Sequence, residues 1–175
     1  RTGAILDGLG AGPVDWFVNT SATDTSGFTY TSSEVTPGMM HLTVDSVGDV
    51  QLGGTIWLPH GTVEIRTAGD LLDVVPEGMV LTAQSTTLAA DGDIGSQAAP
   101  VSVTAEDESF VLLRATAGLN AWLAGRAAFT DPGAAGMMLY LGDLTAGGDL
   151  NLTYVGASRK TEAGEWEAIP ATLQL

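Results

Sequence analysis

A short phrase, in which a corner residue follows a glycine and precedes an apolar residue, recurs along the chain. It reads "SVGDVQL" at 46–52, "TAGDLLDV" at 67–74, "ADGDIGS" at 90–96, "TAGLNAWL" at 116–123 and "TAGGDLNLTY" at 145–154. The corner residues are Asp49, Asp70, Asp93, Asn120 and Asp149, at steps of 21, 23, 27 and 29 residues. Glycine precedes four of the five corners, which predicts a positive φ or a tight corner at that position.

Apolar residues alternate on both sides of each corner. Four residues before the glycine position stand Val44, Ile65, Leu88, Ala115 and Leu144. Two residues further upstream stand Leu42, Val63, Thr86, Leu113 and Gly142. Directly after the corner stand Val50, Leu71, Ile94, Ala121 and Leu150. This period of two predicts strand, turn and strand, with the same face inward in every repeat.

A strand-rich repeat of roughly 20–30 residues is typical of a solenoid, because each repeat buries its apolar face only against its neighbours. The abundance of glycine (23 residues) and the lack of helical periodicity agree with an all-β chain. We therefore predict a right-handed parallel β-helix of about five or six coils. The alternative is an antiparallel β-sandwich, which explains the strands but not the constant phase of the corners.

The repeat also predicts how the chain is divided. Residues 1–37 contain no clear copy of the phrase, and we expect them to form an N-terminal β edge, a cap or a neighbouring coil. Residues 38–175 would then form the β-helix repeat region.

Charge and composition exclude several classes of function. The formal net charge is −15, so the surface repels phosphate backbones and anionic membranes. We expect no nucleic-acid partner and, without a long apolar run, no membrane insertion. The chain has no cysteine, which excludes disulfides and sites built on thiolates.

The corner acids are the best candidates for a metal site. In stacked repeats, equivalent corners lie about 4.8 Å apart, and carboxylates at that spacing could share a calcium ion. The candidate ladder consists of Asp49, Asp70, Asp93 and Asp149. The alternative is that each Asp hydrogen-bonds its own turn and needs no metal, which Asn120 favours. We expect no other cofactor.

We predict no catalytic residue. The two histidines, His41 and His60, do not form a metal-binding pair, and Glu64 and Arg66 on one strand face are typical of a surface ion pair. A solvated loop is expected at 106–108. Four tryptophans could pack against the repeats or provide sugar-stacking platforms: Trp16, Trp57, Trp122 and Trp166.

One stretch carries a family resemblance. The segment "AADGDIGSQAAPVSVTAED" at 89–107 resembles the repeats of filamentous-haemagglutinin-like and leukotoxin-like filamentous adhesins of bacteria. "AGDLLDV" and "GGDLNLTY" are similar to the companion phrase in which Gly-Asp-Leu opens a strand. The resemblance spans roughly residues 40–155 and implies a rod of β-helix coils displayed outside the cell.

These observations lead to a functional hypothesis. We expect a structural or adhesive segment of a large extracellular bacterial fibre or surface protein, without catalysis. Its partners would be adjacent copies or segments of the same protein, end to end, and host or cell-surface glycans. The alternative is a carbohydrate-binding or polysaccharide-cleaving β-helix, which would need convergent acids and bases on its long face.

Overall fold

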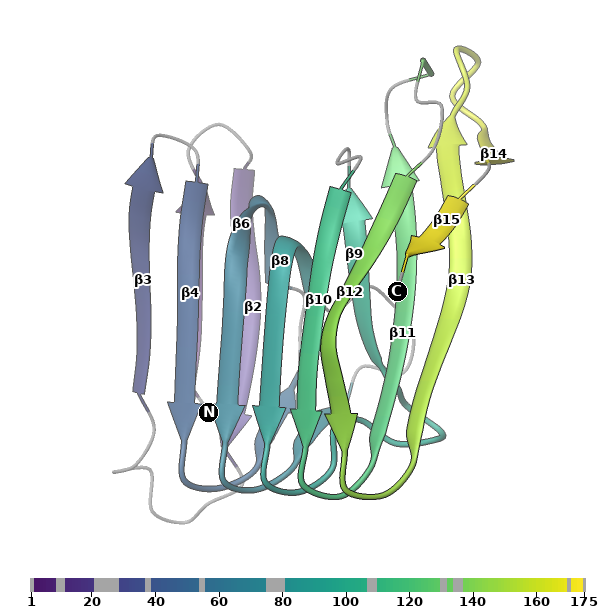
Figure 1. Ribbon diagram of the computed structural model, residues 1–175. Helices are drawn as coiled ribbons and strands as arrows, with labels where there is room; N and C mark the ends of the chain where they lie inside the picture. The colour runs from purple at the N-terminus through teal and green to yellow at the C-terminus, as the bar shows by residue number, and fades with distance from the viewer. Residues whose placement is uncertain are drawn as a thin grey trace.

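The computed structural model describes residues 2–8, 12–20, 29–36, 39–53, 56–74, 81–106, 110–129, 132–133, 137–169 and 171–174. Within these residues the chain is all-β and contains no helix (Figure 1). The strands are β1 (Thr2–Gly8), β2 (Gly12–Thr20), β3 (Thr29–Thr36), β4 (Met39–Ser46), β5 (Val50–Leu52), β6 (Ile56–Thr67), β7 (Leu71–Asp73), β8 (Leu81–Ala90), β9 (Val101–Glu106), β10 (Phe110–Ala117), β11 (Ala121–Phe129), β12 (Met137–Ala146), β13 (Leu150–Lys160), β14 (Trp166–Ile169) and β15 (Ala171–Gln174).

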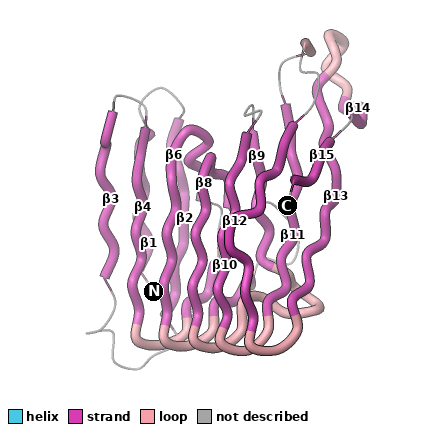
Figure 2. The backbone as a smooth tube through the Cα atoms, in the orientation of Figure 1, coloured by secondary structure: helices cyan, strands magenta, loops and turns pink. Residues whose placement is uncertain are grey.

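Most neighbouring strands are parallel. One row runs β4, β6, β8, β10, β12 and β15, and every pair in it is parallel. The strands that follow the corners are also parallel, with β5 beside β7, and β9 beside β11 beside β13. The corners between the two groups line up along one edge of the molecule (Figure 2). This parallel pairing does not fit the antiparallel sandwich.

Both predicted apolar ladders are confirmed. The first pairs Val44 with Ile65, Ile65 with Leu88, Leu88 with Ala115, and Ala115 with Leu144. The second pairs Val50 with Leu71, Leu71 with Ile94, Ile94 with Ala121, and Ala121 with Leu150. All of these side chains are buried except the last of each ladder, because Leu144 is only partly buried and Leu150 is 43% exposed.

The position assigned to Gly142 is wrong. Leu113 pairs with Leu141 instead, because the register between β10 and β12 shifts between Leu113 and Ala115. A Cβ atom on Gly142 would lie 2.6 Å from Cγ of Arg114. Glycine therefore stands where the Arg114 side chain crosses the neighbouring strand at the bulge.

The first three strands pair in the antiparallel sense. β1 pairs with β2, β2 with β5, and β3 with β4. β1, β2 and β3 lie in the region without a copy of the phrase. β2 and β3 pair with β5 and β4, the first strands of the two parallel rows. The boundary at residue 37 stays a prediction, because residues 37 and 38 lie outside the described residues.

The described part of the chain contains no helix that is long and apolar enough to cross a membrane.

Candidate functional site

The repeated corners form a continuous hydrogen-bonded row, which we call the corner ladder. Each corner side chain from Asp49 to Asn120 accepts a hydrogen bond from the backbone N–H of the next corner along the chain. The distances are 2.9 Å from Asp70 N to Asp49 Oδ1, 2.8 Å from Asp93 N to Asp70 Oδ1, 2.8 Å from Asn120 N to Asp93 Oδ1, and 2.9 Å from Asp149 N to Asn120 Oδ1. These are charge-assisted bonds wherever the acceptor is aspartate.

A backbone hydrogen bond also joins each pair of adjacent corners. The carbonyl oxygen of each later corner accepts the N–H of the residue that follows the earlier corner. The donors are Val50 to Asp70, Leu71 to Asp93, Ile94 to Asn120 and Ala121 to Asp149, each at 2.8 Å. Adjacent corners are therefore joined by a side-chain hydrogen bond in one direction and a backbone hydrogen bond in the other. These bonds satisfy backbone N–H and C=O groups at the corners, between one strand and the next.

The sequence predicts either a positive φ or a tight corner at the glycines before the corners. The expectation of positive φ is wrong, because the described glycines with positive φ are Gly95, Gly156 and Gly164. A Cβ atom on Gly92 would instead lie 2.0 Å from Oδ1 of Asp70. Gly69 is similarly close to Asp49, and Gly148 to Asn120. Glycine is required because the previous corner side chain packs against its backbone.

Two of the corners are further braced by hydroxyl groups. Ser46 Oγ donates to Gly48 O at 2.8 Å, and Thr67 Oγ1 donates to the same carbonyl. Thr67 Oγ1 also accepts the N–H of Gly69 at 3.1 Å. The buried Thr67 side chain therefore connects the first corner with the second.

The ladder bears directly on the calcium hypothesis. Oδ1 of Asp49, Asp70 and Asp93 is already hydrogen-bonded to a backbone N–H of the next corner. The bond runs to the following corner and not, as the alternative hypothesis expected, to the residue's own turn. No group of three or more His, Cys, Asp or Glu in the described part of the chain could hold a metal ion. These acids therefore have a structural partner without a cation.

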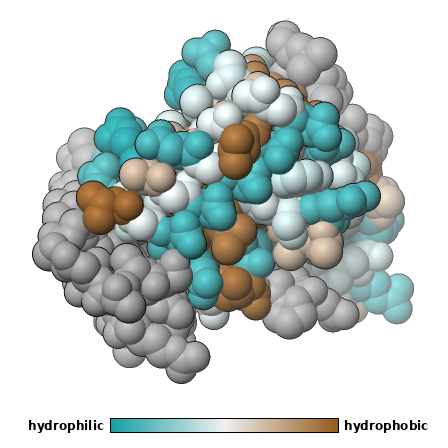
Figure 3. Space-filling view, turned by 90° about the horizontal axis from the view of Figure 1, so that it is seen from below, coloured by the Kyte–Doolittle hydropathy of each residue, from teal (hydrophilic) through white to brown (hydrophobic). Residues whose placement is uncertain are grey.

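The corner edge itself is mostly hydrophilic. Figure 3 shows polar residues over much of this face, with hydrophobic residues scattered among them. Val47 and Leu119 lie at corners and are 67% and 54% exposed. Single exposed apolar residues of this kind are normal on a protein surface and do not mark a site.

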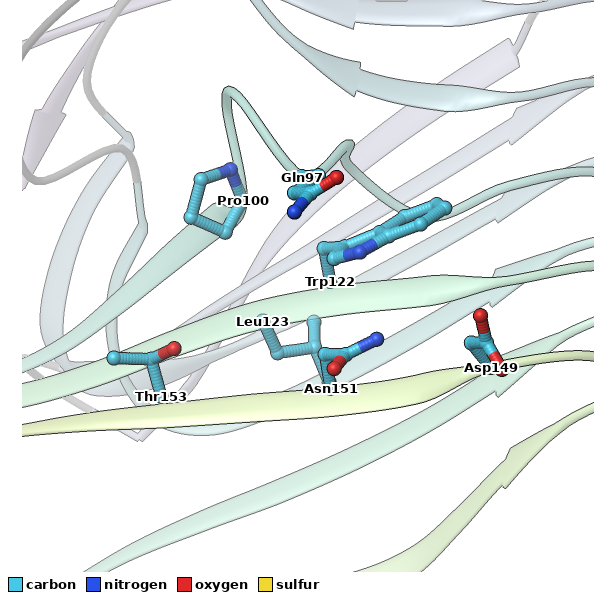
Figure 4. A pocket seen from close by; sticks show the side chains of 7 residues that line it. All are labelled: Gln97, Pro100, Trp122, Leu123, Asp149, Asn151 and Thr153. Atoms are coloured by element: carbon cyan, nitrogen blue, oxygen red, sulfur yellow. The ribbon is translucent and has the colours of Figure 1, made fainter.

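A second feature is an open cleft of about 340 Å³ on the outer face of β11 and β13. It is lined by Gln97, Pro100, Trp122, Leu123, Asp149, Asn151 and Thr153. In Figure 4 the indole ring of Trp122 lies between Gln97, from the loop before β9, and the β13 side. Trp122 pairs with Asn151 across the two strands. An aromatic ring and four hydrogen-bonding side chains therefore share one concave surface.

The cleft exists because one repeat differs from the next two. After Ile94 the chain leaves the sheet and returns at β9, whereas β11 and β13 continue directly from their corners. Gly95 has a φ of 67°, and a Cβ atom there would lie 2.5 Å from the carbonyl oxygen of Trp122. Glycine is therefore needed for the loop to start this close to β11. The loop forms one wall of the cleft beside β11, the strand that carries Trp122.

The loop is held by its own hydrogen bonds. Ser96 N donates to Ala99 O at 2.9 Å, and Ala99 N donates to Ser96 Oγ at 3.0 Å. This turn places Gln97 and Pro100 on the rim of the cleft. In the sequence, "GSQAAP" at 95–100 forms part of a repeat. The extra length that it adds after the corner is the sequence signal for this site.

The other candidates have structural partners. Arg66 Nη2 forms an ion pair with Oε1 of Glu64, and their side chains are 56% and 34% exposed, so the interpretation as a surface ion pair is confirmed. His41 Nδ1 forms a hydrogen bond with Thr62 Oγ1 on the neighbouring strand. Trp166 is 54% exposed and lies outside the cleft.

Several predicted positions lie outside the described part of the structure. The side chains of His60, Trp16 and Trp57 are not among the described ones, nor is the side chain of Glu106. The rest of the expected acidic loop falls within residues 107–109, which are also outside the described ranges.

Comparisons with protein-family models, with curated proteins and with solved structures find no match to this chain.

Proposed function

We propose that the chain is a right-handed parallel β-helix of about five or six coils. We further propose that it serves as a structural and adhesive segment of a large extracellular bacterial fibre or surface protein. The partners would be adjacent copies or segments of the same protein, arranged end to end. Host or cell-surface glycans would be further partners. The resemblance of residues 89–107 to adhesin repeats supports the extracellular setting.

The observation that carries this proposal is that, within the described structure, parts of β12 and β13 leave backbone groups and an apolar side chain unpaired at the end of the two parallel rows. The internal strands use the same groups to pair with one another. Among the described residues, no strand pairs with the outer side of 141–146 in β12 or of 150–156 in β13. Leu150 is 43% exposed there, although its ladder partner Ala121 is fully buried. Asp149 is the last described corner. An added strand–corner–strand unit would cover Leu150 and extend the corner ladder.

A non-catalytic role is part of the proposal. The carboxylates of Asp49, Asp70 and Asp93 accept hydrogen bonds in the ladder. The Glu64 carboxylate forms an ion pair with Arg66 at an exposed position. A polysaccharide-cleaving site would need carboxylates that converge on a substrate instead. The carboxylates with described bonds support structure, which favours the structural hypothesis over the enzymatic one.

The test is self-association of the purified chain, measured by sedimentation velocity over about a hundredfold range of concentration. We expect species heavier than the 17.9 kDa chain, growing with concentration. Leu150→Lys places a charge at the open end of the apolar ladder, and we expect it to abolish association, because charges on an edge oppose strand addition.

The matched control is Leu119→Lys, which places the same charge at an exposed internal corner. This variant should associate like the parent. A thermal melt of each variant establishes that it is folded. A chain that stays at 17.9 kDa throughout, or two lysine variants that behave identically, would contradict the proposal.

A further inference from the structure

We propose that the Trp122 cleft is a binding site for a neutral pyranose sugar. The inference deepens the adhesive part of the proposed function and rests on it for its biological setting. The site itself lies within one chain and does not depend on assembly.

The first argument is the platform. Trp122 is half-buried on the outer face of β11, and Figure 4 shows its indole ring directed into the cleft. An indole combines a large apolar face with a polar N–H, and it loses little conformational entropy when a ligand packs on it. A pyranose ring has one face formed mainly by C–H groups, which is the surface that such a platform fits.

The second argument is the set of hydrogen-bonding groups around the ring. The side-chain amides of Gln97 and Asn151 each provide donors and an acceptor, and Thr153 provides a hydroxyl. The Asp149 carboxylate provides acceptors only. Hydroxyl groups of a sugar act as donor and acceptor together, so they match a mixed set of this kind. A few polar groups that converge beside an apolar surface are typical of small-ligand sites.

The third argument is charge. Among the described residues, no lysine or arginine lines the cleft, and Asp149 gives it an acidic group. The chain as a whole carries a formal charge of −15. An anionic ligand, such as a uronate or a sulfated sugar, would find no cationic partner among the described lining residues and would be repelled by this surface. The ligand class is therefore a neutral sugar.

The fourth argument is preorganisation. Asn151 is fixed opposite Trp122 by the β11–β13 register, and the wall loop is braced by the bonds between Ser96 and Ala99. The cleft, at about 340 Å³, falls within the range of small-ligand sites, roughly 300–1,000 Å³. A site that needs little ordering on binding retains more of its contact energy as affinity.

The experiment is isothermal titration of the full chain with cellotriose, N,N′,N″-triacetylchitotriose and maltotriose, with tri-galacturonate as an anionic probe. We expect at least one neutral trisaccharide to bind with a Kd of about 0.1–10 mM, a range reasonable for one shallow site. We expect no binding of tri-galacturonate.

Three variants locate the site. Trp122→Ala should weaken binding at least about tenfold and Asn151→Ala about threefold or more, since each removes a ligand contact. Trp166→Ala is the matched control, because it removes an exposed tryptophan outside the cleft, and it should bind like the parent. Asn151 is exposed, so its variant tests the site even if Trp122→Ala does not fold.

The inference is overturned if no neutral probe binds at about 20 mM, if tri-galacturonate binds as tightly as the neutral sugars, or if Trp166→Ala loses binding while Asn151→Ala keeps it. Sugar binding by Leu150→Lys separates the two proposals. If this variant is monomeric and still binds sugar, the cleft is supported independently of assembly. If the parent chain assembles but binds no sugar, the cleft proposal alone is refuted.

Discussion

At the scale of single residues, the corner glycines are determined by contact and not by backbone conformation. We expect Gly92→Ala to destabilise the fold by about 1–3 kcal/mol, because its Cβ would meet Oδ1 of Asp70 and force a shift in a packed corner. The measurement is the free energy of unfolding in denaturant. In an Asp70→Ala background the same change should cost less, since the blocking oxygen is gone. Equal costs in both backgrounds would show that the contact is not the cause.

Tyr154 is a second feature at this scale. Burial raises the pKa of the Tyr154 phenol above its ordinary value of 10.0, and its hydroxyl has no hydrogen-bond partner in the described structure. The folded state therefore holds the phenolic proton more tightly than the unfolded state, and this contribution to stability is present below pH 10 and declines as pH rises further.

The pH effect can be measured with Tyr154→Phe, which has no phenol to ionise. The melting temperature of the parent should fall more steeply than that of the variant as the pH is raised above 10.0. Parallel curves for the two proteins would contradict the assignment to this group.

At the scale of elements, one inward row of side chains contains a polar residue that should lower the stability of the fold. Thr86 stands between Val63 and Leu113 in an otherwise apolar row, and its fully buried Oγ1 has no hydrogen-bond partner in the described structure. Thr86→Val keeps the shape and removes the desolvated hydroxyl, so we expect a gain of about 1 kcal/mol in unfolding free energy.

The control for this element is Thr87→Val on the same strand. Thr87 points to the opposite face and is only partly buried, so its variant should change stability by no more than about 0.5 kcal/mol. A loss of stability in Thr86→Val would show that the hydroxyl finds a partner in solution.

At the scale of the whole molecule, the formal charge of −15 reflects an excess of carboxylates, some of which belong to the corner ladder. Because the ladder uses backbone N–H groups as its donors, we expect calcium to raise the melting temperature no more than magnesium at equal ionic strength. Chelator should leave the melting temperature unchanged.

The coupling between ligand binding and folding gives the stabilisation expected if calcium does bind. A specific site at 100-fold saturation would add about 2.7 kcal/mol, which corresponds to roughly 5–10 °C in a chain of this size. A calcium-specific shift of that size would restore the hypothesis of a metal ladder at Asp49, Asp70, Asp93 and Asp149.

The sequence alone was sufficient for the parallel ladders and for the corners that join them. Alternation of period two specifies which face is inward, and a constant corner phase aligns the repeats, so the pairs from Val44 to Ile65 and from Val50 to Leu71 follow directly. It failed at Gly142, because a bulge changes the register by one residue without altering the apolar pattern that surrounds it.

The tertiary structure decided what depends on contacts between repeats. The need for glycine beside a corner comes from a side chain 20 or more residues earlier, as between Asp49 and Gly69. No local sequence pattern shows that these two residues come into contact. The cleft likewise requires the Gly95 loop to lie beside β11, which carries Trp122. Local alternation encodes faces and phase, whereas a concave site depends on where two separate segments end up relative to each other, and only folding brings them together.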